Sequence, residues 1–127
     1  MTPYRVLVTG SRDWEDEDLI RHQITRVWLL ANLPFVVVHG ACPTGADWIA
    51  GGWVNDVAVA HLGPVIEEPH PADWKTHGRA AGPIRDQRMV RLGADMCLAF
   101  IHKGTRDATG CADLAEAAGI PTRRWTV

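Results

Sequence analysis

Three short apolar runs in this chain are each followed directly by a turn that contains glycine. The runs with their turns are Val6–Arg12, Val36–Asp47 and Leu98–Arg106. A near-continuous run of valine, isoleucine and leucine is typical of a parallel strand that helices cover on both faces. Parallel strands end at one common edge of their sheet, where glycine lets backbone N–H groups approach a bound anion. The sequence therefore predicts a parallel α/β sheet with a crevice for a phosphate or nucleotide at that edge.

Strands and helices are expected to alternate along the whole chain. We predict strands at residues 4–9, 35–39, 64–67, 95–101 and 122–125, and helices at residues 16–31, 44–60, 84–92 and 109–118. With no internal repeat and no low-complexity linker, this alternation predicts a single doubly wound, Rossmann-like domain over residues 1–127. Right-handed crossovers and a switch point beside the first strand favour a five-stranded, mainly parallel sheet of order 3-2-1-4-5.

Two features of the sequence fall outside this regular pattern. The segment Pro69–Pro83 has no periodicity, so we expect a loop, and loops of this length are usually functional or mobile. Six tryptophans are many for 127 residues. Most are expected to pack in the core or to cover loops, whereas stacking on a base or ring is the alternative for Trp14 or Trp74.

Composition and charge limit the classes of partner that the chain can have. No apolar stretch approaches the roughly 18 residues that span a membrane, and the N-terminus lacks a signal-peptide pattern, so a cytoplasmic protein without membrane contact is expected. The net charge of -2 argues against bulk electrostatic binding to nucleic acid. A local cluster of Arg85, Arg88 and Arg91 still favours a small anionic ligand.

Neither a metal nor a cofactor is predicted. Cys42, Cys97 and Cys111 are odd in number and irregularly spaced, which is typical of reduced thiols in a cytoplasmic protein. His39 and Cys42 form a half-pair, but no second pair follows at zinc-like spacing. The chain also lacks the spaced glycines of a dinucleotide fold and the Lys-Ser/Thr of a P-loop, so neither of these cofactor-binding modes is expected.

Several polar residues of the turns have both a binding and a structural interpretation. Arg12 offers a planar fork for phosphate, or it pairs with a nearby aspartate. Thr44 and Thr109 either contact the ligand or act as helix N-caps. Asp47 either accepts a hydroxyl, for instance from a ribose, or is an ordinary first-turn carboxylate. The residues expected to bind the ligand are Gly10, Ser11, Arg12, Gly40, Thr44, Gly45, Asp47, Arg79, Arg85, Gly104, Thr105 and Thr109.

A known family resembles this chain in motifs that follow one another over nearly its whole length. These motifs are Gly10-Ser11-Arg12-Asp13-Trp14, His39-Gly40 with Thr44-Gly45-Ala46-Asp47, and Gly82-Pro83-Ile84-Arg85 with Met89. Together they resemble the SLOG superfamily, and within it the small YspA-like, YpsA-related proteins common in actinobacteria and their phages. The superfamily has a Rossmann-like fold. It includes the Lonely Guy phosphoribohydrolases, which release a base from a nucleoside monophosphate, and the DNA-processing protein A family.

The resemblance assigns roles to individual residues, with departures. Arg85 and Met89 resemble the arginine and methionine of the Lonely Guy Arg-Lys…Met motif. Gly104-Thr105 resembles the end of its phosphate-binding Pro-Gly-Gly-x-Gly-Thr, although Ile101-His102-Lys103 stands in place of Pro-Gly-Gly. The glutamate that follows Gly-Thr in the hydrolases is absent, and Asp107 is the nearest carboxylate. The resemblance therefore implies the fold and the pocket, but not hydrolase activity.

Three functions follow from these considerations. The first is a nucleotide-binding sensor or processing module without turnover. The alternative is base-releasing hydrolysis, in which Asp107 or Asp47 would support an oxocarbenium-like sugar and Arg85 would hold the ligand or aid departure of the base. The third is a DNA-processing accessory protein, which the absence of a continuous basic stripe disfavours. A homodimer through the outer helices is compatible with the resemblance.

Overall fold

The computed structural model describes residues 2–31, 34–104 and 106–127, and only the backbone of residues 106–108. Five parallel strands form one sheet in the order β3-β2-β1-β4-β5, which confirms the order expected from the sequence. The strands are β1 (Tyr4–Gly10), β2 (Phe35–His39), β3 (Val65–Pro69), β4 (Met96–Ile101) and β5 (Thr122–Thr126). The α-helices are α1 (Glu17–Leu30), α2 (Gly45–Val59), α3 (Trp74–His77), α4 (Ala81–Leu92) and α5 (Arg106–Ala117).

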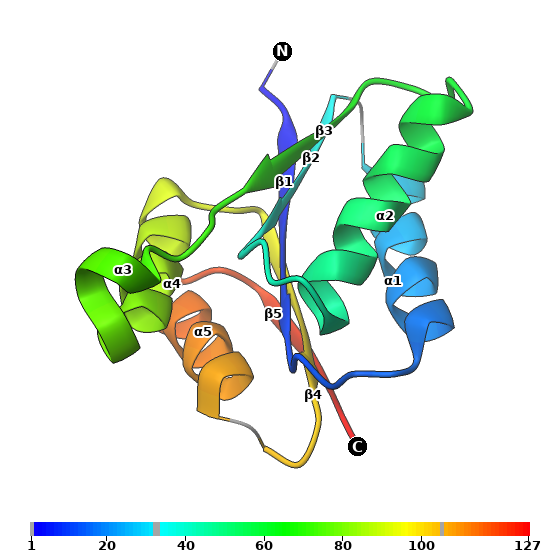
Figure 1. The fold of residues 1–127 in the computed structure, drawn as a ribbon. Coiled ribbons are helices and arrows are strands. Elements are labelled where there is room, and N and C mark those ends of the chain that lie inside the picture. The colour runs from blue at the N-terminus through cyan, green and yellow to red at the C-terminus, as the bar shows by residue number, and fades with distance from the viewer. Residues whose placement is uncertain (1, 32–33, 105) are drawn as a thin grey trace.

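Helices cover both faces of the sheet, with α1 and α2 on one side and α3, α4 and α5 on the other (Figure 1). Because side chains alternate along a strand, neighbouring residues of β1 enter different cores. Val6 and Val8 pack in a cluster with the buried faces of α1 and α2. Leu7 packs instead with Met89 of α4 and Cys111 of α5. The alternation therefore holds the two helical layers against opposite faces of β1.

The start of α1 and the end of α5 follow ordinary capping rules. The side chain of Asp16 caps α1 by accepting the N–H of Leu19 at 3.1 Å. After α5 the chain turns at Gly119, whose φ of +83° suits glycine. The N–H groups of Gly119 and Ile120 then donate to the carbonyl oxygens of Glu116 and Ala115. None of the helices in the described ranges has the length and apolar character needed to cross a membrane.

The segment Pro69–Pro83, which was expected to be a loop, is largely helical, so that expectation is wrong. It contains α3, a 3₁₀ turn at Gly78–Ala80 and the start of α4. Asp73 begins α3 by accepting the N–H of Thr76 at 3.2 Å. Pro83 lies in the first turn of α4, where a missing N–H leaves no helical hydrogen bond unmade. These elements are too short for a periodic pattern to reveal them.

Candidate functional site

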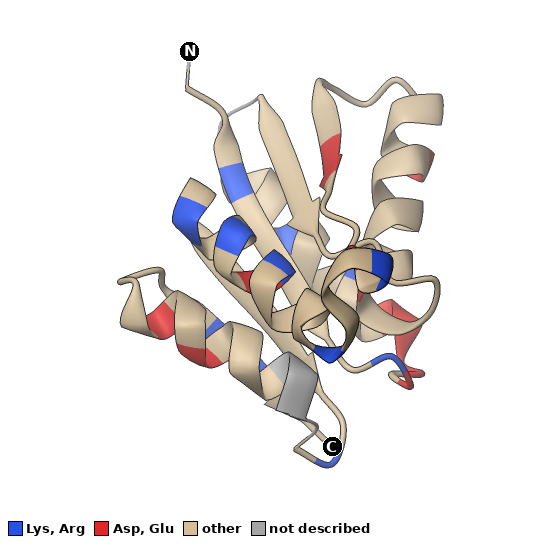
Figure 2. Cartoon of the chain, turned by 60° about the vertical axis from the view of Figure 1, so that its left-hand side comes forward, with Lys and Arg blue, Asp and Glu red and all other residues tan. Residues whose placement is uncertain are grey.

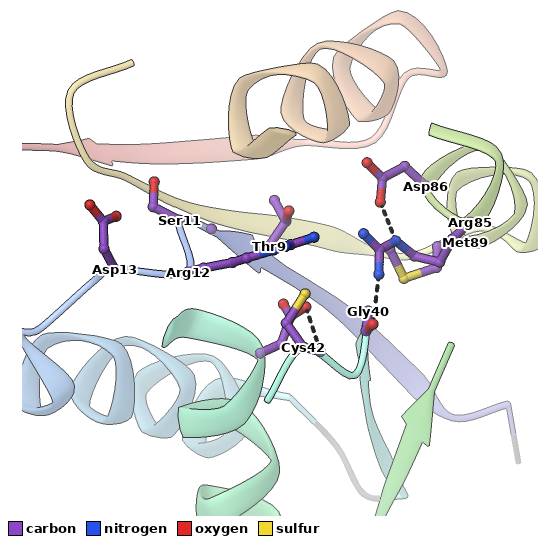
Figure 3. A pocket seen from close by; sticks show the side chains of 11 residues that line it. Thr9, Ser11, Arg12, Asp13, Gly40, Cys42, Arg85, Asp86 and Met89 are labelled. Atoms are coloured by element: carbon purple, nitrogen blue, oxygen red, sulfur yellow. Dashed lines mark hydrogen bonds and ion pairs between the residues drawn. The ribbon is translucent and has the colours of Figure 1, made fainter. Parts of the chain in front are cut away.

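A cavity of about 230 Å³ lies at the carboxyl edge of the sheet, where β1 and β2 end. Its wall consists of the end of β1 and the turn that follows it, the turn after β2, the start of α2 and one side of α4 (Figure 3). The lining residues are Thr9, Gly10, Ser11, Arg12, Asp13, Gly40, Cys42, Asp47, Arg85, Asp86 and Met89. Beside β1 the chain switches from one side of the sheet to the other, and ligands of doubly wound folds bind at such points.

Two glycines allow the turns after β1 and β2 to pack backbone against backbone. A Cβ on Gly45 would collide with the carbonyl oxygen of Ser11 and lie 2.6 Å from Cα of Arg12. The φ of Gly45, +73°, is also one that other residues rarely adopt. A Cβ on Gly10 would lie 2.6 Å from Cβ of Ala46. Glycine at both positions is thus a requirement of the close approach of the two turns.

Ser11 joins the turn after β1 to the end of β4. Its N–H donates to the carbonyl oxygen of Phe100 at 2.9 Å, and its Oγ accepts the N–H of His102 at 2.8 Å. The next carboxylate, Asp13, lies 2.7 Å from Nδ1 of His102, and that hydrogen bond lowers the pKa of Asp13. These contacts fix the turn after β4 against the one after β1.

His39, at the end of β2, holds the following turn in shape. Its Nδ1 accepts the N–H of Ala41 at 2.9 Å, so Nε2 carries the proton and donates to Oε2 of Glu67 at 2.6 Å. The hydrogen bond from the N–H of Ala41 to His39 holds Ala41 at a φ of +58°. A Cβ on Gly51 in α2 would lie 2.6 Å from the same Glu67 oxygen, which gives this helical glycine a packing role.

Arg85 reaches from α4 to the floor of the cavity and is 7% exposed. Its Nε donates to Oδ1 of Asp86, and its Nη1 donates to the carbonyl oxygen of Gly40, both at 2.6 Å (Figure 3). Burial alone would lower the pKa of Arg85, but the Asp86 carboxylate outweighs burial and holds it above its ordinary value. A buried guanidinium fixed by two partners provides a preorganised cation in the cavity.

Asp47 and Cys42 also line this cavity, and a Cβ on Gly40 would meet both Asp47 and Arg85. The buried carboxylate of Asp47, in the first turn of α2, accepts the N–H of Cys42 at 3.3 Å. Burial raises the pKa of the Cys42 thiol, and the nearby Asp47 carboxylate raises it further. The described lining therefore holds two arginines and three aspartates. Such a wall suits a ligand that carries hydroxyl groups as well as an anionic group.

A second cavity of about 570 Å³ continues from the first and shares Arg12, Arg85 and Asp86 with it. It opens between α3, the start of α4 and α5, and its lining adds Trp74 and Arg79, among others. The guanidinium carbon of Arg12 lies 5.4 Å from the centre of the Trp74 ring, a cation–π contact. The two cavities together reach the volume of ordinary ligand pockets.

Most of the residues expected to bind a ligand border one of these two cavities. Gly10, Ser11, Gly40 and Asp47 line the first, Arg79 the second, and Arg12 and Arg85 both. Gly45 supports the turns, as described above. Arg12 contacts Trp74, while its neighbour Asp13 pairs with His102, so the structural alternative of a nearby aspartate for Arg12 is not seen among the described contacts.

Three of the expected residues, Thr44, Gly104 and Thr109, are absent from the two cavity linings described above. Thr44 occupies the N-cap position of α2 and is exposed, but its side chain makes no capping hydrogen bond. Gly104 is exposed in the turn after β4, with a φ of +61°. Thr109 is not an N-cap, because α5 begins earlier, at Arg106. Thr105 and the side chain of Asp107 lie outside the described residues.

Sequence reasoning undervalued three residues of the two cavities. Asp86, which forms an ion pair with Arg85, is not among the residues expected to bind the ligand. Cys42 was considered only as half of a metal pair. Trp74 was one of two candidates for stacking, and only the structure separates them, because Trp14 is 5% exposed and packs edge-on against Phe100.

The charges around the site are unevenly distributed. Several Lys and Arg residues lie along α3 and α4, with Asp86 among them, whereas α5 carries Asp and Glu residues (Figure 2). The second cavity is lined by Arg85 of α4, Arg79 of the 3₁₀ turn and Arg12 of the turn after β1. Within residues 2–31, 34–104 and 106–127, no group of three or more His, Cys, Asp or Glu side chains is arranged to hold a metal ion.

Comparison with known proteins gives two matches. Residues 4–77 match the family model YAcAr, described as the YspA, cpYpsA-related SLOG family. The chain is also similar to the Gene 61 protein of Mycobacterium phage D29, with 40% identity over 117 residues, which cover 92% of each chain. No solved structure matches the chain.

Proposed function

Because the chain belongs to the YspA, cpYpsA-related SLOG family, we propose that its two connected cavities bind a phosphorylated nucleotide or nucleotide-derived ligand. The chain would act as a sensor or processing module for this small molecule. Its partner is therefore a small anion, and neither a membrane nor a nucleic acid is required. Family membership supports a nucleotide-related ligand in general, and the site geometry supports the more specific proposal.

The observation that carries the proposal is the position of Arg85. A buried guanidinium that borders a cavity at the carboxyl edge of a parallel sheet is suited to pair with an anionic ligand, in addition to the ion pair that it forms with Asp86. The same cavity is bordered by the glycine turn after β1 and by the first turn of α2, whose N-terminal N–H groups carry partial positive charge. These groups together can hold one phosphate.

The aspartates of the wall limit how much negative charge the ligand can carry. Asp13, Asp47 and Asp86 offset Arg12 and Arg85 in the first cavity. A di- or triphosphate would place several further negative charges beside these carboxylates, whereas a monophosphate would not. Asp47 is also suited to accept hydrogen bonds from sugar hydroxyls. We therefore propose a ligand with one phosphate and a ribose-like sugar in this cavity.

Calorimetric titration with matched nucleosides and nucleoside 5′-monophosphates tests the proposal. Charge-assisted hydrogen bonds should favour each phosphorylated member by about 1.5–3 kcal/mol. Arg85→Ala should remove most of this difference, while Arg124→Ala serves as the control because Arg124 pairs with Asp113 and Glu116 away from the cavities. Equal affinity of nucleoside and nucleotide for the wild type would refute the phosphate site.

One observation also favours the alternative of base-releasing hydrolysis. The Asp47 carboxylate lines the same cavity as Arg85, so a carboxylate and a cation could both contact a sugar bound there. In that case the wild type should release free base from a nucleoside 5′-monophosphate, and Asp47→Asn or Asp107→Asn should stop it. Chromatography of each incubated variant gives the answer. Binding without release would assign the chain to the non-hydrolytic module.

A further inference from the structure

Among the described tryptophans, Trp74 is the one that lines the second cavity. It is 48% exposed at the start of α3. Trp14 is buried against Phe100, and Trp28 and Trp53 pack edge-on against each other between α1 and α2. Exposing half of an indole to water in a concave surface is unfavourable unless something covers it. Among the described tryptophans, Trp74 is therefore the one that combines an exposed ring with a place in a cavity lining.

A flat group already occupies one face of this indole. The planar guanidinium of Arg12 lies above it, with its central carbon 5.4 Å from the ring centre. Arg12 also borders the first cavity, so its side chain stands between the two spaces. A residue in this position can turn toward an anion in the first cavity and leave the indole to another planar group.

Gly82 allows the side chains of Arg85 and Trp74 to lie close to each other. A Cβ on Gly82 would lie 3.5 Å from Cη2 of Trp74 and 3.7 Å from Nη2 of Arg85. The indole and the guanidinium of Arg85 therefore border the same glycine from two sides. A ligand held by Arg85 at one end would have Trp74 within reach of its other end.

We propose that the second cavity is a base-binding subsite, in which Trp74 stacks on the nucleobase of the ligand whose phosphate lies in the first cavity. This inference rests on the proposed function. Arg12 holds the indole face in the free protein and moves to the phosphate when the ligand binds. Arg79 also lines this cavity. Stacking on an aromatic face accepts any base, so Trp74 supplies affinity for a base rather than choice among bases.

Calorimetry with ribose 5-phosphate and the four ribonucleoside 5′-monophosphates tests the subsite. The wild type should bind at least one nucleotide about 10- to 100-fold more tightly than ribose 5-phosphate, as expected for one stacked base. Trp74→Ala should abolish this advantage and leave the affinity for ribose 5-phosphate unchanged. Trp74→Phe should restore most of it.

Two controls make the result specific. Trp48, 61% exposed on α2 and outside the lining of both cavities, provides the matched variant Trp48→Ala, which should bind as the wild type does. Nucleotide should also quench tryptophan fluorescence in the wild type, and the quenching should be lost in Trp74→Phe. The fluorescence comparison holds even if Trp74→Ala proves unstable.

The outcomes separate the subsite from the proposed function. If the wild type binds ribose 5-phosphate and every nucleotide with equal affinity, the phosphate site is supported and the base subsite is overturned. The base subsite would also be overturned if Trp74→Ala still bound nucleotide more tightly than ribose 5-phosphate, or if it lost affinity for the two ligands equally. If neither ribose 5-phosphate nor any nucleotide binds, the proposed function and this inference fall together.

Discussion

Arg85 donates through Nη1 to the carbonyl oxygen of Gly40, 2.6 Å away, so that a side chain of α4 closes the turn after β2. Arg85 lies in α4 and Gly40 in the turn after β2, and both line the first cavity, so the contact joins two parts of its wall. Gly40 is needed for this contact, because a Cβ there would collide with Nη1 of Arg85 and lie 2.9 Å from Oδ2 of Asp47. A single missing methyl group thus leaves room for both the cation and the carboxylate of the site.

Substitution of Gly40 by alanine should displace the Arg85 guanidinium. The variant should lose about 1–3 kcal/mol of unfolding free energy, because a buried charged group must shift, and should bind phosphorylated ligands more weakly. Urea denaturation measures the stability, with Gly110→Ala as the control. A Cβ on Gly110 meets nothing within 4 Å inside α5, so that variant should gain about 0.5–1 kcal/mol. Similar stability of the two variants would contradict the packing at Gly40.

Gly45 and Gly104 offer a second matched pair, because both have positive φ and only one is crowded. Gly104→Ala should cost about 1 kcal/mol from backbone strain alone, since a Cβ there meets open space. Gly45→Ala should cost at least about 1–2 kcal/mol more, because its Cβ collides with the backbone of Ser11 and Arg12. Thermal unfolding of the two variants makes the comparison. Equal losses would mean that the turns after β1 and β2 do not pack as described.

The charge of Asp86 should limit the affinity for anions. Asp86→Asn keeps the shape of the side chain and frees the Arg85 fork from a negative partner. Affinity for a nucleoside monophosphate should rise by about 1 kcal/mol, or about fivefold, while stability falls by about 1–2 kcal/mol. Asp113→Asn on the outer side of α5, where Asp113 pairs with Arg124, should change neither binding nor the preference for one phosphate. Unchanged nucleotide affinity of Asp86→Asn would show that the charge of Asp86 does not limit anion binding.

Glu68 should make the fold sensitive to acid. A bidentate contact with Arg5 and a hydrogen bond from His70 lower its pKa from 4.5 to about 2. Because the folded-state pKa is the lower one, this carboxylate stabilises the protein above about pH 4.5, and the contribution is lost as pH falls toward 2. After allowance for solvent screening, the contribution is about 1–2 kcal/mol. Urea denaturation of wild type and Glu68→Gln at pH 7, 4 and 3 should show their difference shrinking with acid.

The strand order could be predicted from the sequence because it rests on local patterns. Continuous apolar runs, helical spacing and right-handed connections are all visible along the chain, and they lead to the order 3-2-1-4-5 that the structure confirms. Gly10 and Gly40 could also be predicted as site residues, because a glycine directly after an apolar run indicates a turn at the end of a buried strand. The start of α5 was placed three residues too late, because Thr109 is of a residue type favoured at N-caps and was taken as the start of the helix.

The rest of the site depends on contacts between residues far apart in sequence. Arg85 and Gly40 are separated by 45 positions, and Ser11 and His102 by 91. Nothing near Trp74 in the sequence shows that Arg12 lies over its ring, or that Gly82 lies between it and Arg85. The short helix α3 that presents Trp74 has no periodicity to reveal it. Such relations follow only from the fold.

The alkylation rate of Cys42 tests most directly whether a phosphorylated nucleotide occupies this cavity. Cys42 lines the first cavity, whereas Cys97 and Cys111 are buried in the core, and burial raises the pKa of Cys97 to about 12. Iodoacetamide at mildly alkaline pH should therefore modify Cys42 first. Mass spectrometry should show that a saturating nucleoside 5′-monophosphate slows this modification by about tenfold, and that the matching nucleoside at the same concentration does not. An unchanged rate under a nucleotide that calorimetry shows to be bound would place the ligand elsewhere and contradict the account.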